Sequence, residues 1–381
     1  MTKCQVFLMC AACAALLTGC ASAPSTQIET PPRAAQFDIA LDWFYEIEPG
    51  FGKYLGATPL ELGGVKDIGL ITLAASSGGK VLAIDNASAR QVWLKDFEMP
   101  VTAGPVVYEN GVFVALGNGS ILKLNLKTGE TVWHYEAGVA VENGLSVADG
   151  IVACVNANNR IFAIDEKTGT LKWRKERPRS QDFSMYGQSA PLISDEMVYA
   201  GYSDGTVVAY AALNGTALWS RELAPNARFK DVDAPPIRVG NTIFVASSSG
   251  GIYALSADDG QTLWQRDIYG ISSIRHFQDS LYISSQSGIF RLNRITGDTI
   301  WQNVVQKEAL ISPLVLGKNA IYAAVQKYGL IVLDRANGDL MHVIDMGSDF
   351  TSAPDFMPGV ITAMSNRSTV YRYFVDDEPV R

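Results

Sequence analysis

Histidine and cysteine, which often supply metal ligands and nucleophiles, are scarce in this chain of 381 residues. The three histidines, His134, His276 and His342, are scattered and lack the spacing of a zinc site. The sequence also lacks a Gly-x-Ser-x-Gly nucleophile elbow, a phosphate-binding P-loop and an EF-hand loop. We therefore predict no catalytic residue, no bound metal and no cofactor.

Positive charge is also in short supply. The chain has 31 Lys and Arg against 39 Asp and Glu, a formal net charge of −8. No basic patch interleaved with aromatic residues is present, which argues against a nucleic-acid partner. One basic run extends from Lys172 to Arg179. Charges in such a place more often protect a strand edge than bind a ligand, and we favour that interpretation.

The apolar run at the N-terminus is short. Residues Val6–Leu17 fit the hydrophobic region of a signal peptide and are too few to span a bilayer. The Leu-Thr-Gly-Cys sequence at residues 17–20 resembles the lipobox of bacterial lipoproteins. That resemblance implies cleavage before Cys20, which would carry the lipid, and Ala21 after it implies sorting to the outer membrane. An ordinary signal peptide with an incidental cysteine is the alternative.

The five cysteines leave no disulfide under this interpretation. Residues 1–19 would be removed as a signal peptide, and Cys20 would be the lipid anchor. Cys154 is then alone in a strand-like segment, and we predict a small core residue there. Residues 20–40, rich in Ser, Thr, Pro and Ala, are predicted to form a flexible tether.

What the chain has in abundance is a repeat. A Gly-x-x-x-Trp pattern recurs with 37 to 46 residues between successive Trp positions, as in propellers and other repeat arrays. Ala89 replaces the glycine in the first copy, and His342 replaces the tryptophan in the last. The Trp-type positions are Trp93, Trp133, Trp173, Trp219, Trp264, Trp301 and His342.

Each repeat has the content of about four strands. An alternating strand such as residues 160–165 runs into a polar turn that ends in Gly, and a Trp-bearing strand follows. Two further short apolar segments precede each alternating strand. This pattern predicts a four-stranded antiparallel blade, with the tryptophans as packing residues and His342 as a smaller filler at the weakest junction.

The two ends of the chain complement each other. Residues 350–374 supply three strand-like runs without a Trp strand, whereas residues 41–47 contain Trp43 without a preceding hairpin. We predict that they share one blade, which closes the ring and removes exposed sheet edges. The fold class is therefore all-β: an eight-bladed propeller over residues 41–374, with a tail at 375–381. Seven blades is the alternative.

The repeat resembles those of quinoprotein dehydrogenases, eight-bladed propellers that hold pyrroloquinoline quinone and Ca²⁺. In that family the quinone stacks between a tryptophan and a disulfide of adjacent cysteines. This chain has no Cys-Cys pair, and all seven tryptophans occupy repeat positions. The departure argues against a quinone cofactor.

The repeat is least regular between Trp173 and Trp264, where the intervals are 46 and 45 residues. The extra residues are predicted to connect an outer strand to the inner strand of the next blade, and so to lie on one face. The first connection contains Phe183, Met185 and Tyr186, and the second contains Asp231 and Asp233. Loops that depart from a repeat often carry binding, so a protein-binding patch is one interpretation. The other is that the apolar residues cap a blade and the aspartates fix turns.

The lipobox, tether, repeats and N-terminal closure together resemble the BamB family of outer-membrane assembly lipoproteins. In that family two interblade loops bind the POTRA domains of BamA, through a Leu-Ser-Leu-Arg run and an Asp-Val-Asp run. Tyr186 stands where the family pattern has Arg. The positions that match the two runs are Phe183, Ser184, Met185 and Tyr186, and Asp231 and Asp233.

The resemblance implies a non-enzymatic scaffold of the β-barrel assembly machine, lipid-anchored on the periplasmic face of the outer membrane. Its partners would be BamA, other components of the machine and, as a further possibility, unfolded barrel substrates that add to exposed strand edges. The alternatives are a quinone-dependent dehydrogenase and a periplasmic propeller that binds a small ligand or glycan.

Overall fold

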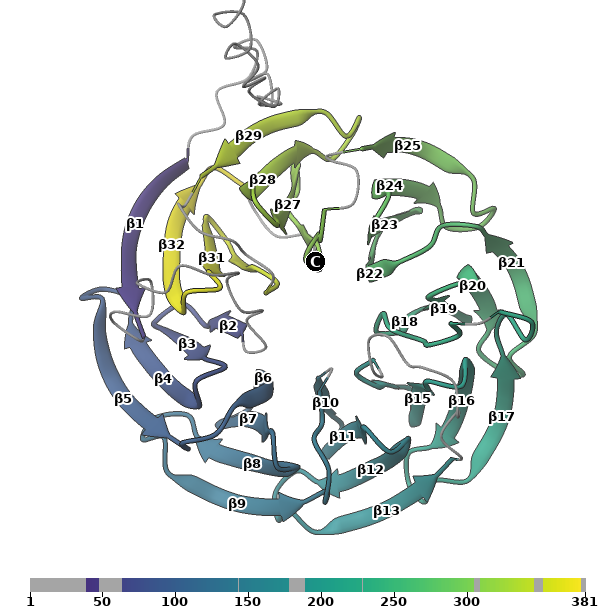
Figure 1. Cartoon of the computed structure of the whole chain (residues 1–381), viewed down its shortest axis with the longest axis horizontal. Coiled ribbons are helices and arrows are strands. Elements are labelled where there is room, and N and C mark those ends of the chain that lie inside the picture. Colours follow the sequence, from purple (N-terminus) through teal and green to yellow (C-terminus); the bar gives the residue numbers. More distant parts are fainter. Residues whose placement is uncertain are drawn as a thin grey trace, which may run out of the picture. The chain divides into compact units, whose positions relative to one another are not determined.

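All regular elements of the described chain are β-strands. The structure, a computed structural model, describes residues 39–47, 64–142, 144–177, 189–227, 229–304, 309–345 and 352–377. Within these residues 32 strands form eight four-stranded sheets. Figure 1 shows the sheets arranged as blades around one axis, so the predicted eight-bladed propeller is confirmed and the seven-bladed alternative is wrong.

The first four blades follow the chain from the inner strand to the outer strand. Blade 1 contains β2 (Gly64–Asp67), β3 (Ile71–Ala75), β4 (Lys80–Asp85) and β5 (Arg90–Asp96). Blade 2 contains β6 (Val101–Tyr108), β7 (Gly111–Leu116), β8 (Ser120–Asn125) and β9 (Thr131–Glu136). Blade 3 contains β10 (Leu145–Ala148), β11 (Ile151–Asn156), β12 (Arg160–Asp165) and β13 (Leu171–Glu176). Blade 4 contains β14 (Leu192–Ser194), β15 (Met197–Gly201), β16 (Thr206–Ala211) and β17 (Ala217–Glu222).

The next three blades repeat this order, and the eighth combines the two ends of the chain. Blade 5 contains β18 (Ile237–Val239), β19 (Thr242–Ser247), β20 (Gly251–Ser256) and β21 (Thr262–Arg266). Blade 6 contains β22 (Ile271–Phe277), β23 (Ser280–Ser285), β24 (Gly288–Asn293) and β25 (Thr299–Asn303). Blade 7 contains β26 (Val315–Leu316), β27 (Ala320–Val325), β28 (Gly329–Asp334) and β29 (Leu340–Ile344). Blade 8 contains β30 (Asp355–Met357), β31 (Val360–Met364), β32 (Thr369–Val375) and β1 (Ile39–Glu46).

The hydrophobic core lies between the blades. Eight clusters of buried apolar side chains occupy the eight junctions between neighbouring blades, within the described residues. The middle strands β11 and β23 are buried along their whole length, because both faces of an inner strand meet another blade. The outer strands β5, β9 and β13 lie at the rim of the disc and are mostly exposed, and in each of them only the tryptophan is buried.

The Gly-x-x-x-Trp repeat links neighbouring blades. Each repeat glycine lies in a hairpin turn against the tryptophan of the preceding blade: Gly260, for example, contacts Trp219. The six repeat glycines have φ between +69° and +79°, and a Cβ at these positions would lie 2.5 to 2.8 Å from a Trp ring atom. Glycine is therefore required twice, by the left-handed backbone and by the close approach of the indole. The glycines are Gly129, Gly169, Gly215, Gly260, Gly297 and Gly338.

The indole N–H groups form hydrogen bonds across most of the same junctions. Six tryptophans donate to a backbone carbonyl of the next blade's hairpin at 2.7 to 3.2 Å. Trp301 contacts Gly338, but its Nε1 is buried and has no hydrogen-bond partner among the described residues. The junction between blades 6 and 7 therefore lacks the indole hydrogen bond that six other junctions have.

His342 does not fill the junction between blades 7 and 8, so that expectation is wrong. It pairs with Val332 at the register position of the tryptophans, but its side chain is exposed. The physical reason lies in blade 8, whose outer strand β1 comes from the other end of the chain. Because β32 and β1 are not consecutive in the chain, no hairpin joins them, and among the described residues no repeat turn packs on residue 342.

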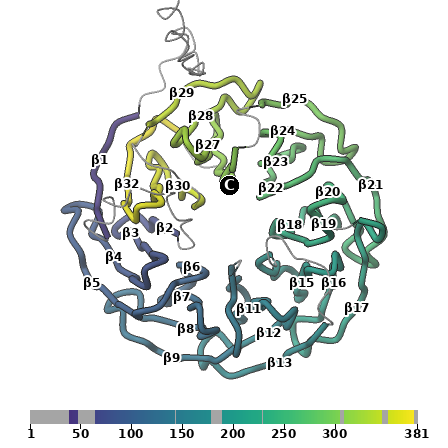
Figure 2. Tube along the Cα trace, in the orientation of Figure 1, coloured from purple at the N-terminus to yellow at the C-terminus, as the bar shows by residue number. Residues whose placement is uncertain are grey.

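The ring closes between β1 and β32, as the sequence predicts (Figure 2). Blade 8 is joined to blade 1 by charged groups. Arg372 on β32 donates from Nε to Asp67 at 2.8 Å and also pairs with Asp42 on β1. Lys66 pairs with Asp355 at 2.9 Å. Residues from both ends of the chain thus meet in one network.

Candidate partner-binding site

Two long interblade connections leave outer strands at the same face of the ring. One runs from β13 to β14 and the other from β17 to β18 (Figure 1). Phe183, Ser184, Met185 and Tyr186 lie in the first connection, outside the described residues. Cys20, the predicted signal peptide and nearly all of the predicted tether also lie outside them. The second connection, residues 223–236, is described except for residue 228.

Asp231 and Asp233 both lie against the β19–β20 turn of blade 5. The backbone oxygen of Asp231 accepts a hydrogen bond from the Ser248 amide at 2.9 Å, and the Ser248 hydroxyl donates to the Asp233 carboxylate. Asp231 is only 1% exposed, whereas Asp233 is partly exposed. The sequence predicts both residues in a surface loop that is open to a partner. Because Asp231 is buried, it holds the conformation of the loop instead.

The environment of Asp233 favours its neutral form. Burial raises the pKa of this carboxyl to about 7, and the negative charge of Asp231 adds to the rise. The hydrogen bond from Ser248 opposes both effects. Asp233 therefore titrates near neutral pH, which is unusual for a carboxyl group.

Val232, between the two aspartates, holds the two connections together. Its side chain is fully buried against Gly201, where an added Cβ would lie 2.3 Å from a Val232 side-chain carbon. Its amide donates to the Tyr202 carbonyl at 3.2 Å, and its carbonyl accepts from the Ser189 amide at 3.2 Å. Ser189 follows the undescribed part of the first connection. The structure therefore brings the end of the first connection onto the second.

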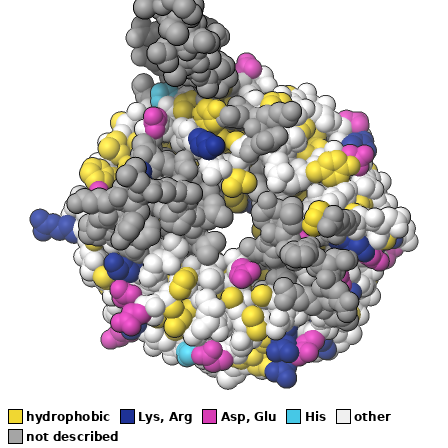
Figure 3. Space-filling model, in the orientation of Figure 1, with side chains coloured by type: hydrophobic (Ala, Val, Ile, Leu, Met, Phe, Trp, Pro, Cys, Tyr) yellow, Lys and Arg dark blue, Asp and Glu magenta, His cyan; other side chains and the backbone are white. Residues whose placement is uncertain are grey.

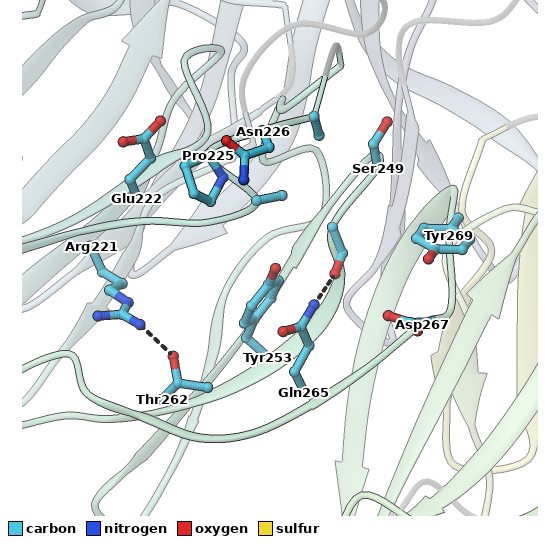
Figure 4. Close-up of a pocket in the computed structure, with 13 residues that line it drawn as sticks. Arg221, Glu222, Pro225, Asn226, Ser249, Tyr253, Thr262, Gln265, Asp267 and Tyr269 are labelled. Atoms are coloured by element: carbon cyan, nitrogen blue, oxygen red, sulfur yellow. Dashed lines mark hydrogen bonds between the residues drawn. The ribbon is translucent and has the colours of Figure 1, made fainter.

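A surface hollow of about 440 Å³ adjoins the second connection (Figure 4). Residues 224–227 of this connection form one wall. The β19–β20 turn and the β21–β22 connection form others. The sequence carries no signal for this hollow, because its residues come from three segments that become neighbours only in the folded ring. The side chains of Tyr253, Gln265, Asp267 and Tyr269 face it.

The histidines lie in three different blades. His134 on β9 contacts Glu136 at 2.6 Å, and His276 on β22 contacts the Gln278 carbonyl at 2.5 Å. His342 is on β29. Across the described ranges, no group of three or more His, Cys, Asp or Glu residues is placed to hold a metal ion.

Cys154 is fully buried on β11, as predicted, and burial raises the pKa of its thiol to about 12. The described chain contains no helix with the length and apolar character needed to cross a bilayer.

Figure 3 shows a hollow at the ring axis, and most of the charged side chains in view lie toward the rim. All seven tryptophans are in outer strands, where they pack between blades. None of them is on the axis to stack on a quinone, and the sequence has no adjacent cysteines. The residues present therefore do not fit the quinone site of the dehydrogenases that the repeat resembles.

Solved structures confirm the fold class. BamB from Moraxella catarrhalis superposes with a TM-score of 0.77 at 18% identity, covering 88% of this chain and 100% of that one. The computationally designed Ika8 protein superposes with a TM-score of 0.70 at 18% identity, covering 84% of this chain and 98% of that one. Quinohemoprotein alcohol dehydrogenase from Comamonas testosteroni superposes with a TM-score of 0.70 at 14% identity, covering 90% of this chain and 77% of that one. At these identities the likeness is one of fold alone: an eight-bladed β-propeller.

Sequence comparison then gives the family. The profile of the outer membrane protein assembly factor BamB matches residues 77–303, which is more than half of the chain. The chain belongs to this family. Comparison with curated proteins gives no match. Family membership indicates a periplasmic protein associated with the outer membrane.

Proposed function

We propose that this protein is a non-enzymatic scaffold of the outer-membrane β-barrel assembly machine. It binds the POTRA domains of BamA through the β13–β14 and β17–β18 connections. The observation that carries the proposal is the hydrogen bond between Ser189 and Val232, because it brings the end of the first connection against the second. The family match supports the choice of machine.

In this proposal the ring supplies rigidity and the connections supply recognition. Asp231 and Val232 are buried and hold the second connection against blades 4 and 5. The exposed residues Pro225 and Asn226 and the partly exposed Asp233 are available to a partner. Phe183, Ser184, Met185 and Tyr186 belong to the proposed surface as well, with Tyr186 as an aromatic anchor. Anchoring through Cys20 would keep the ring beside the membrane.

The test is co-purification of BamA with the full-length protein from detergent-solubilised envelope. Changing both Phe183 and Met185 to Ser should reduce the BamA recovered by about tenfold, as expected for loss of apolar anchors. Asp233→Asn should reduce the BamA recovered by less, because Asp233 is only partly exposed. Asp149 and Asp279 lie in the β10–β11 and β22–β23 turns, at the opposite ends of the strands.

Changing Asp149 and Asp279 to Asn is therefore a matched control that should leave BamA recovery unchanged. If the Phe183 and Met185 variant retains full recovery while it folds normally, the first connection is not a BamA contact. If wild-type protein recovers no BamA at all, the proposed scaffold role is wrong.

A further inference from the structure

The hollow beside the β17–β18 connection has an excess of acceptors. Its floor and walls come from the ends of β17 and β21 and from the β19–β20 turn (Figure 4). Asp267 is exposed, and its side chain makes no hydrogen bond or ion pair within the described part of the chain. Its carboxylate therefore has free acceptor capacity at the hollow.

Of the three described cations near the hollow, Lys230 and Arg266 are paired with carboxylates, and Arg221 is hydrogen-bonded to a hydroxyl. Arg221 donates to the Thr262 hydroxyl at 3.2 Å, and Lys230 pairs with Glu222 at 3.1 Å. Arg266, next to Asp267 in sequence, pairs instead with Asp298 at 2.9 Å. Two charges at the hollow therefore have no oppositely charged partner among the described residues: Arg221 lies on the side of Thr262, and Asp267 lies on the other side, beside Tyr269 (Figure 4).

Two tyrosines and one carboxamide complete the lining. Tyr269 is 48% exposed, so one part of its ring is open to solvent beside Asp267. Tyr253 is nearly buried, and it lines the hollow together with Ala224 of the connection. The Gln265 amide nitrogen donates to the Gly250 carbonyl at 2.9 Å, and this leaves the Gln265 oxygen available as an acceptor.

A carboxylate, a carboxamide oxygen and an exposed aromatic ring together suit a guanidinium group. Arginine carries five donors and no acceptor, and its planar cation stacks on aromatic rings. We propose that this hollow receives an arginine side chain of the protein that docks on the β17–β18 connection. The inference rests on the proposed function and adds the chemistry of one contact to it.

The test is a double-mutant cycle between the full-length protein in detergent and purified BamA POTRA domains, with Kd measured by titration. Asp267→Asn and Tyr269→Ala should each weaken binding by about tenfold, as expected for a charge-paired, stacked arginine. Each arginine of the POTRA domains is then changed to Ala. For one of them, the loss should largely disappear when Asp267 is already Asn.

Two variants serve as controls. Asp279→Asn makes the same charge change on the opposite face and should leave Kd unchanged. Arg221→Gln removes the cation that lines the hollow and should leave Kd unchanged or lower it. Loss of binding in Arg221→Gln, with normal binding in Asp267→Asn, would mean that the hollow takes an acidic group, and it would overturn the inference.

The remaining outcomes separate the two proposals. If wild-type protein binds the POTRA domains and Asp267→Asn binds within about twofold of it, the arginine contact is wrong and the scaffold role stands. If the effect of each POTRA arginine substitution on binding simply adds to the effect of Asp267→Asn, the proposed contact is also wrong. If the wild-type protein does not bind the POTRA domains, both proposals fall.

Discussion

At the scale of single residues, each glycine of the repeat is explained by a tryptophan that lies one blade away. Gly260 has φ +72°, and its hydrogens face the ring of Trp219. Sequence alone assigns the glycine to its own hairpin, because the indole it contacts is 41 positions earlier in the chain. Both the backbone and the neighbouring ring therefore exclude a side chain at this position.

Gly260→Ala should destabilise the domain by about 2–4 kcal/mol, because it combines left-handed backbone strain with overpacking against Trp219. Gly240→Ala is the matched control. Gly240 also has positive φ, +59°, but a Cβ added there would meet no atom within 4 Å. Gly240→Ala should lower the free energy of unfolding by only about 1 kcal/mol, because it adds backbone strain without a clash. Urea unfolding of both variants gives the comparison, and equal losses would contradict the role of the indole contact.

The buried carboxyl of Asp233 makes stability depend on pH. Its folded-state pKa of about 7 lies above the usual 3.8, so the folded protein binds more protons than the unfolded chain between these values. The contribution of this group is therefore most favourable at low pH and is lost as pH rises toward 7.

Asp233→Asn removes this penalty, since Asn stays neutral and still accepts from Ser248. The gain in its free energy of unfolding over wild type should be about 2–3 kcal/mol larger at pH 8 than at pH 5. Denaturant unfolding at the two pH values measures the difference. A gain that is the same at both would show that Asp233 is already ionised without cost in the folded state.

At the scale of elements, the junctions between blades are built alike but are not equally strong. The Trp219 indole donates to the Ala257 carbonyl at 2.8 Å, whereas the Trp301 indole has no acceptor among the described residues. The next junction has the exposed His342 instead of a tryptophan. Both junctions of blade 7 therefore lack the indole hydrogen bond, and blade 7 is packed less firmly than the other blades.

Trp219→Phe should cost about 1 kcal/mol more than Trp301→Phe, because only the first substitution breaks an indole hydrogen bond. Both substitutions remove similar ring area, so each serves as the control for the other. Thermal or urea unfolding of the two variants supplies the comparison. A larger loss for Trp301→Phe would contradict the unequal junctions.

At the scale of the whole molecule, the ring depends on the network between blades 8 and 1. Asp67 is buried and accepts from Arg372 on β32, from Asn86 at 3.0 Å and from the Gly69 amide at 2.7 Å. Asp67→Ala should destabilise the domain by about 3–5 kcal/mol, because it leaves the Arg372 charge buried without this partner.

Asp298→Ala is the control for the Asp67 substitution. Asp298 also pairs with an arginine, but its side chain is 70% exposed, so the loss should stay below about 1 kcal/mol. Chemical denaturation measures both. Comparable losses would mean that the closing network adds no more stability than a surface ion pair.

The fold could be predicted from sequence because its signals are local. Alternating strands, turn glycines and one tryptophan per repeat define a blade within about forty residues, and the unmatched Trp43 segment indicates closure by β1. Contacts between blades carry no such signal. The burial of Asp231, the exposure of His342 and the hollow at Asp267 each depend on segments that only the closed ring brings together.

The central claim is that the face carrying the interblade connections binds BamA. Site-specific photo-crosslinking in intact cells tests it most directly, with a photoreactive residue at Asn226 on this face and at Asp279 on the opposite face. The account predicts a BamA adduct from position 226 and none from position 279. An adduct from position 279 alone, or none from either, would contradict it.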